Sequence, residues 1–466
     1  MIRQLWPRTV ATALACMTPG VVAAQGTSAT GIRPAGEQSS RNVHIMSHIP
    51  LPGGGNRGVA NLGGIEIRTA DVEIEQELAR PYAYVPMWGA PSQVHIISLK
   101  DPAKAKILYT WTIENPELHV PAGALAPSYF KTHGRYYLVN GFQFGSGGPD
   151  ADLGAIVWDL TGLPDTSTIK EAGRIRLTAV PGGFHETVTY KHSSGVPLLL
   201  ATTRSSVGHI YDMDKFLAKD PNFGLVGKVP VPDSSNYQWQ GYHDFYAAYD
   251  PATHQDKFYG AGWGGYYIYD ISDVANAKLI TSITGMAGIS FGHSIQATPD
   301  GRYAVIQSEY QYAPIRIVDL KPGLDGTVKT ISRPVGAWTA SWDGNPHNYQ
   351  VRWPYVFVAA FEDGFQVFNM MDPTNPYTVG YYDTYDKPHA AGPMGAGLVG
   401  GMPGAWGAAV RNADGLIAIS DMLTGFWAFK MDGFDGWNGH QWGMPNISAA
   451  QDWDNGPEGA PKKAIS

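Results

Sequence analysis

Short apolar runs separated by turn-rich segments follow one another along most of the chain. One phrase recurs among them, an aromatic or aliphatic run that ends in an Asp-like position followed by another apolar residue. It occurs as VHIISL (94–99), AIVWDL (155–160), GHIYDM (208–213), YYIYDI (266–271), IRIVDL (315–320), FQVFNM (365–370) and FWAFKM (426–431). The mean period is about 55 residues, and runs of this length rich in β-branched and aromatic residues predict strands.

Each copy contains enough apolar runs for four strands. A buried-looking run such as YYLVNG (136–141) or YVFVAAF (355–361) precedes the phrase, another run precedes that one, and a fourth such as AKLITSIT (277–284) follows. Four short strands repeated at this period are typical of a propeller blade. The sequence therefore predicts an all-β fold, a seven-bladed β-propeller over residues 42–431.

The two ends of the repeat region complement each other. The seventh copy ends at FWAFKM without a fourth strand, while NVHIMSHIPL (42–51), ahead of the first copy, has the character of one. We expect this N-terminal strand to complete the last blade, because closing the ring removes two exposed sheet edges. Residues 25–41 are predicted to be a flexible segment, and residues 432–466, rich in Gly, Trp, Asn and Pro, an irregular tail over the surface.

Three longer stretches carry a resemblance to a known family. The segments YIYDISDVANAK (267–278), VFNMMDPTNPYTVGYYDTY (367–385) and GAWGAAVRNADGLIAISDMLTGFWAFK (404–430) resemble the LVIVD-repeat family of exported β-propellers, including its choice-of-anchor B members. The resemblance covers residues 42–431 and implies the propeller fold without implying one particular activity. The first two copies depart from the motif, with Ser98 and Leu99 where an Asp-Ile pair is expected.

The first 24 residues have the features of a secretory signal peptide. Arg3 and Arg8 lie in a short basic leader, an apolar stretch follows, and Val22-Ala23-Ala24 forms a small-residue cleavage site. Cys16, the single cysteine, lies inside this leader, and the residue three before it is Ala13, which disfavours lipidation. We therefore expect a periplasmic or secreted, thiol-free protein without membrane insertion.

The net charge narrows the range of partners. Without the leader's two arginines the chain has 31 basic residues of the original 33, against 41 acidic ones, a formal charge of −10. An acidic surface argues against nucleic acid as a partner. A small-molecule substrate is the expected partner, and the protein is expected to be a monomer.

Four histidines recur at the blade period, at the start of the first predicted strand. Copies three to six begin FHETVTY (184–190), YHDFYAAY (242–249), GHSIQAT (292–298) and PHNYQVRW (346–353), which gives equivalent places to His185, His243, His293 and His347. The first strand of a propeller blade is innermost, and all first strands run the same way. We therefore expect four imidazoles at one depth around one mouth of the central channel.

Two interpretations of these histidines stay open. They can be framework residues that hydrogen-bond a neighbouring blade, as the histidine of the WD repeat does. Alternatively they hold one transition-metal ion, because convergent neutral imidazoles favour Fe, Cu or Zn over Mg or Ca. A four-histidine iron centre in a seven-bladed propeller is also the arrangement of the carotenoid-cleaving oxygenases, a likeness of architecture alone.

The residues around the histidines suggest supporting roles. Each histidine is followed by a polar residue, and side chains alternate along a strand, so these residues are expected to point between blades and to hydrogen-bond the next blade's ring: Glu186, Asp244, Ser294 and Asn348. Aligning the other three blades places apolar residues at the histidine position. These are Ile74, Leu125 and Trp406, which we expect to line a substrate pocket.

These features together predict a metal-dependent enzyme, an oxidoreductase or a lyase, that acts on a small organic substrate. The alternative is a non-catalytic propeller that binds a glycan, a peptide or a cell-surface partner through its loops. The Gly- and Met-rich insertion 386–407 leads into Trp406 and is either a lid over the mouth or an ordinary loop.

Overall fold

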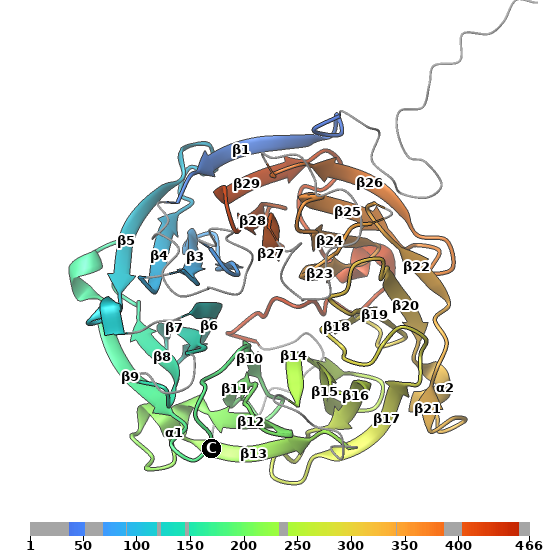
Figure 1. The fold of residues 1–466 in the computed structure, drawn as a ribbon, viewed down its shortest axis with the longest axis horizontal. Helices are drawn as coiled ribbons and strands as arrows, with labels where there is room; N and C mark the ends of the chain where they lie inside the picture. Colours follow the sequence, from blue (N-terminus) through green and yellow to red (C-terminus); the bar gives the residue numbers. More distant parts are fainter. Residues whose placement is uncertain are drawn as a thin grey trace, which may run out of the picture.

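Seven sheets are arranged in a ring around a central channel (Figure 1). Six of them have four antiparallel strands, and the seventh has a short fifth strand that pairs parallel at its outer edge. The computed structural model describes residues 37–51, 69–89, 91–118, 123–144, 149–232, 241–341, 343–385 and 403–455. The predicted seven-bladed β-propeller is confirmed. The predicted leader, residues 1–24, and residues 386–402 of the predicted lid lie outside the described residues.

The first four blades follow one another along the chain, each from its innermost to its outermost strand. Blade 1 consists of β2 (Glu73–Ile74), β3 (Tyr82–Met87), β4 (Gln93–Ser98) and β5 (Lys106–Thr112). Blade 2 consists of β6 (Ala124–Thr132), β7 (Arg135–Phe142), β8 (Leu153–Asp159) and β9 (Lys170–Arg176). Blade 3 consists of β10 (Thr187–Lys191), β11 (Pro197–Ala201), β12 (Val207–Asp212) and β13 (Leu225–Pro230). Blade 4 consists of β14 (Tyr242–Asp250), β15 (Gln255–Gly262), β16 (Gly265–Asp270) and β17 (Lys278–Thr284), with the short β21 (Thr330–Ile331) added at its outer edge.

The last three blades complete the ring. Blade 5 consists of β18 (Ser294–Ala297), β19 (Tyr303–Gln307), β20 (Ile315–Asp319) and β22 (Gly336–Trp338). Blade 6 consists of β23 (Tyr349–Arg352), β24 (Tyr355–Ala359), β25 (Phe365–Asn369) and β26 (Tyr377–Tyr382). Blade 7 consists of β27 (Ala405–Val410), β28 (Ile417–Asp421), β29 (Gly425–Met431) and, from the other end of the chain, β1 (Val43–Ile49).

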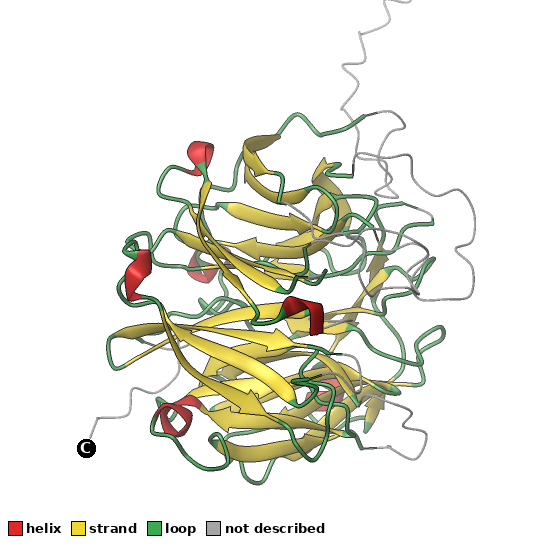
Figure 2. Cartoon of the chain, turned by 60° about the vertical axis from the view of Figure 1, so that its left-hand side comes forward, coloured by secondary structure: helices red, strands yellow, loops and turns green. Residues whose placement is uncertain are grey.

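The helices of the described chain are short and lie in connections between strands, apart from one in the C-terminal tail (Figure 2). The α-helices are α1 (Met213–Leu217) and α2 (Lys321–Leu324). The 3-10 helices are η1 (Pro102–Lys104), η2 (Pro116–Leu118), η3 (Thr166–Thr168) and η4 (Gly439–Trp442). Within the described ranges, no helix is long and apolar enough to cross a membrane.

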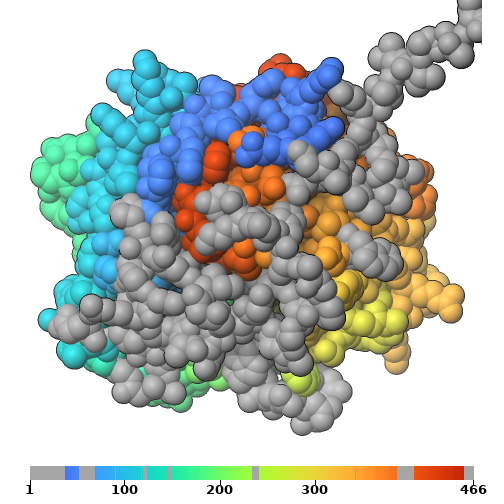
Figure 3. All heavy atoms as spheres, turned by 45° about the horizontal axis from the view of Figure 1, so that its top comes forward, coloured from blue at the N-terminus to red at the C-terminus, as the bar shows by residue number. Residues whose placement is uncertain are grey.

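The N-terminal strand closes the ring as predicted. β1 pairs antiparallel with β29, from Val43 opposite Met431 to Ile49 opposite Phe426, and Figure 3 shows the blue N-terminal strand lying against the red and orange blades. The chain is already ordered before this strand, because Ser39 forms a bridge with Tyr382 of β26. Of the segment predicted to be flexible, residues 25–41, only residues 37–41 are described, and its flexibility stays a prediction.

The core consists of separate apolar layers between neighbouring blades. Strands such as β11, β24 and β28 are buried along their whole length or nearly so, because a middle strand of a blade is covered by neighbouring blades on both faces. One such layer joins Phe357 of blade 6 to Phe429 of blade 7 and to Val43 of β1. Burial of these faces drives the packing of blade on blade.

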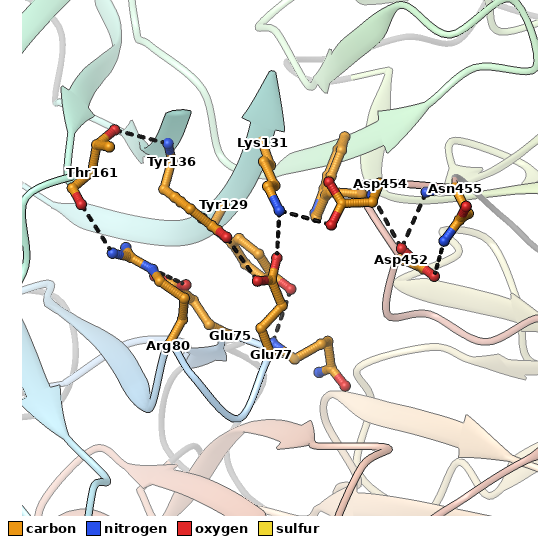
Figure 4. Close-up of polar contacts among 12 residues, drawn as sticks. Glu75, Glu77, Arg80, Tyr129, Lys131, Tyr136, Thr161, Asp452, Asp454 and Asn455 are labelled. Carbon is orange, nitrogen blue, oxygen red and sulfur yellow. Dashed lines mark hydrogen bonds and ion pairs between the residues drawn. The ribbon is translucent and has the colours of Figure 1, made fainter. Parts of the chain in front are cut away.

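The described part of the tail, residues 432–455, is irregular apart from η4. Its end is tied to blade 2, where the Lys131 ammonium group donates to Asp454 at 2.8 Å and to Glu77 at 3.2 Å (Figure 4). Trp453 packs its ring against Phe130 and is almost fully buried. The tail thus enters the core instead of crossing the surface alone, as Figure 1 also shows where it runs across the middle of the ring.

Candidate metal centre

The four predicted histidines lie side by side at one mouth of the channel. The ring centroids of His185 and His243 are 4.2 Å apart, those of His243 and His293 4.1 Å, and those of His293 and His347 4.5 Å. Each ring comes from a different one of blades 3 to 6, at or just before the start of the innermost strand. Four consecutive blades therefore bring their imidazoles into one continuous row.

A β-bulge at this place in the blade sets the direction of each histidine. In blade 4 the register shifts between Tyr242 and Asp244, which leaves His243 as the extra residue. In blade 3 the backbone N–H groups of His185 and Glu186 both donate to the Thr202 hydroxyl group. A bulge sets two residues against one partner and breaks the alternation of side chains along the strand.

The bulge overturns the orientation predicted for the following residues. The side chains of Glu186, Asp244, Ser294 and Asn348 line the central channel below the histidines and do not point between blades. The described hydrogen bonds include none from these four to the histidine of a neighbouring blade. Ser294 instead lies 3.3 Å from Nδ1 of His293, the residue before it in the chain.

A carboxylate lies among the histidines. Glu309 follows the second strand of blade 5 by two residues, and its carboxyl oxygens lie 3.9 Å from Nε2 of His243, 3.5 Å from Nε2 of His293 and 3.5 Å from Nε2 of His347. His243, His293 and Glu309 each offer one ligand atom, and these three atoms all lie within 4.8 Å of one another. Sequence reasoning missed Glu309.

Several polar atoms of this cluster are buried and have no hydrogen-bond partner. They are Nδ1 of His243, Nε2 of His293 and Oε1 of Glu309. A buried polar atom without a partner costs about 1–3 kcal/mol, so such atoms are rare and call for an explanation. Three such atoms within one cluster of side chains indicate a place for a ligand.

Burial keeps the whole cluster uncharged. It lowers the pKa of His347 to about 3 and that of His185 to about 4, and it moves the pKa of both His243 and His293 well below the usual value for histidine. Burial also raises the pKa of Glu309 to about 8. The imidazoles are therefore neutral at neutral pH and have lone pairs available for a cation.

Two of the rings are held in a defined tautomer. Nδ1 of His347 donates to the backbone carbonyl of Trp406 at 2.7 Å, so Nε2 carries the lone pair and faces Glu309. Nδ1 of His185 donates to Oε1 of Gln143 at 2.5 Å. In metal-binding histidines, a hydrogen bond from the ring nitrogen that does not bind the metal fixes the tautomer in the same way.

The opposite side of the mouth is apolar. Leu125 and Trp406 lie in one buried cluster with Ala70 and Phe361, and the Trp406 ring is 4.4 Å from that of His347. Ile74 is not part of this cluster. It is completely buried in the layer between blades 1 and 7, so its predicted place in a substrate pocket is wrong and Ala70 takes the position instead.

Below the histidines the channel widens into a cavity of about 110 Å³. Carboxyl groups from three blades line it, and burial raises the pKa of Asp71 to about 7 and the pKa of both Glu73 and Asp244 to about 8. Tail residues Ala449–Gln451 and Trp453 line the same cavity. The described tail therefore fills the end of the channel opposite the histidines.

No protein-family model matches the sequence, and no curated protein is significantly similar to it.

Proposed function

We propose that this protein is a metalloenzyme that holds one transition-metal ion among His243, His293, His347 and Glu309, with His185 beside them. Its reaction class is an oxidation–reduction or a lyase reaction on a small organic molecule. The proposal rests on the geometry of the Glu309 carboxyl group among three imidazoles. The remaining support comes from the donor types and from the neutral state of the rings.

The distances around Glu309 carry the proposal. A hydrogen bond from nitrogen to oxygen spans about 2.7–3.2 Å, which is shorter than the 3.5, 3.5 and 3.9 Å between Glu309 and the three rings. Two ligands bound about 2.1 Å from one metal ion at a tetrahedral angle lie about 3.4 Å apart. The cluster therefore has the spacing of ligands around an ion and not that of a hydrogen-bonded network.

The donor set favours particular metals. Two histidines and one glutamate form the closest group, and two imidazoles with one carboxylate are the ligands of mononuclear non-haem Fe(II) enzymes and of several catalytic Zn(II) sites. No cysteine lies among the described residues to provide a thiolate ligand for copper(I). We propose Fe(II) as the resident ion and Zn(II) as the next candidate.

Metal analysis tests the proposal directly. Elemental mass spectrometry of protein purified without a histidine tag is expected to show about one metal ion per chain. Glu309→Gln should lower the affinity for Fe(II) at least tenfold, since it removes the single anionic ligand. His95→Ala is the control, because His95 is a buried histidine outside the cluster, in blade 1, and bonds Thr110.

Nitric oxide then separates an enzyme from a purely structural site. An Fe(II) ion with an open coordination position binds nitric oxide and gives a characteristic electron paramagnetic resonance signal. We expect that signal in the Fe(II)-loaded protein and its loss in Glu309→Gln. An Fe(II) ion that binds tightly without any nitric oxide signal would favour the non-catalytic alternative. Failure to bind any of Fe, Cu or Zn would refute the metal site.

The proposal also includes export and family membership. The features of residues 1–24 support cleavage near Gln25, and the repeat phrases support membership of the LVIVD-repeat family. Mass spectrometry of the protein isolated from the periplasm or the medium tests the first point. A mature chain that still contains Cys16 would contradict it.

A further inference from the structure

In each blade, one residue at the end of the second strand pairs with the bulge of the first strand. A corresponding position lies two residues after that residue in every blade. We call these the rim positions. In blade 5, His293 donates its backbone N–H to Gln307, and Glu309 is two residues further on. In blade 6, His347 donates to Ala359, and Phe361 is two residues further on. The rim positions are Trp88, Gln143, Arg204, Trp263, Glu309, Phe361 and Met422.

Arg204 occupies the rim position of blade 3. The Thr202 hydroxyl group accepts the backbone N–H of His185, and Arg204 follows Thr202 by two residues. A Cβ added to Gly182 would lie 2.3 Å from Cδ of Arg204, so the arginine stem packs on the segment that leads into His185. Arg204 and Glu309 thus hold equivalent places on either side of blade 4.

The Arg204 guanidinium group has no counter-charge in the described chain. No described side chain forms an ion pair with it, and its Nε is buried without a hydrogen-bond partner. The positive charge also adds to burial in lowering the pKa of His185. A partly buried arginine whose Nε has no partner and which forms no described ion pair is suited to binding an anion.

We propose that Arg204 binds the carboxylate group of a small-molecule substrate beside the metal ion. A guanidinium group presents parallel N–H donors that match the two oxygens of a carboxylate. The rim position of blade 3 places that anion beside the segment that leads into His185, in the blade next to the one that carries His243. This inference names the substrate class and rests on the proposed function, although the anion site itself needs no metal.

The test compares propionate with its neutral analogue propionamide by calorimetry, with both Fe(II)-loaded and metal-free full-length protein. We expect propionate to bind at least tenfold more tightly than propionamide, and Arg204→Gln to abolish that difference while leaving Fe(II) content unchanged. Arg204→Lys should restore part of the preference, because it keeps the charge and loses the two-pronged geometry. Arg302→Gln, which removes an exposed arginine paired with Asp319, is the control and should have no effect.

The outcomes are distinguishable. A protein that binds no metal but prefers propionate through Arg204 refutes the proposed function and leaves the anion site standing. A wild-type protein that binds both ligands equally, or an Arg204→Gln variant that keeps the preference, overturns the anion site. Inorganic phosphate binding tenfold more tightly than propionate through Arg204 would overturn the assignment to a carboxylate.

Discussion

Replacing Val43 by alanine should weaken the ring at its closing strand. Val43 is 5 % exposed and opposes Met431 at the end of the β1–β29 ladder. A Cβ on Gly380 would lie 3.0 Å from a Val43 methyl group, so Val43 also packs against blade 6. Ile45, two residues further along the same strand, is 42 % exposed and provides a matched control.

The two substitutions should differ several-fold in cost. Val43→Ala removes two buried carbon atoms at about 0.8 kcal/mol each, and the cavity left behind adds about 1 kcal/mol, for a loss of about 2–3 kcal/mol. Ile45→Ala lies at the surface and should change stability by less than about 0.5 kcal/mol. Unfolding entropy of about 2.1 cal/mol/K per residue over roughly 400 ordered residues converts these into Tm shifts of about 3 °C and less than 1 °C.

Thermal unfolding followed by calorimetry or tryptophan fluorescence, at one scan rate and one protein concentration, measures both shifts. The wild type and the two variants should also be compared for unfolding rate in guanidinium chloride, where Val43→Ala should unfold faster. Equal Tm values for the two variants would mean that β1 does not hold the ring closed through its buried side, and the account of ring closure would fail.

Two further predictions concern the channel and the tail. The raised pKa of Glu73, about 8 against 4.5, means that its protonated form stabilises the fold below about pH 4.5 and that this stability is lost as the pH rises to 8. Glu73→Gln should therefore show a smaller fall in Tm between pH 5 and pH 8 than the wild type, by a few degrees. Glu114→Gln should not, because desolvation raises the pKa of that carboxyl but its hydrogen bonds and the Arg174 charge together lower it. Parallel pH profiles for Glu73→Gln and the wild type would contradict the assignment. Trp453→Ala should cost about 3 kcal/mol by thermal unfolding, because its ring packs on Tyr129 and Phe130, and Trp442→Ala, at a tryptophan that is 38 % exposed, should cost far less. Equal costs would mean that the end of the tail does not dock as described.

The ring could be predicted from the sequence because each blade repeats the same apolar phrase. The phrase marks the third strand of every blade, from β4 (Gln93–Ser98) to β29 (Gly425–Met431). Each blade must bury both faces of its middle strands, so the apolar pattern is enforced seven times and stays visible even where one copy is degenerate. The missing fourth strand of the seventh copy and the additional strand ahead of the first copy were enough to predict how the ring closes.

The candidate site was predictable only in part. The histidines repeat at the blade period, but Glu309 does not, because the equivalent positions hold unrelated residues such as Phe361 and Met422. The one available signal was topological: in an antiparallel blade the end of the second strand lies beside the start of the first. An ungapped alignment also missed the insertion that moves Ile74 away from the mouth and puts Ala70 there.

The β-bulge was the hardest feature to predict. It depends on one extra residue whose presence leaves no mark in the apolar pattern, and period-two alternation then assigns the following side chain to the wrong face. Asp244 and Asn348 were misplaced for this reason. Their true location in the channel follows from backbone hydrogen bonds that only the folded chain reveals.

At the bulge, the strand pairing that stabilises the ring is independent of the side chain that faces the channel mouth. The same backbone irregularity carries histidine in blade 4 and tryptophan in blade 7, where the register shifts around His243 and Trp406. Equivalent positions in different blades thus accept different side chains, and the residue at one of them can be replaced without changing the strand pairing that closes the ring. Single substitutions can therefore change which side chains line this mouth, for instance by extending the arc of imidazoles with Leu125→His.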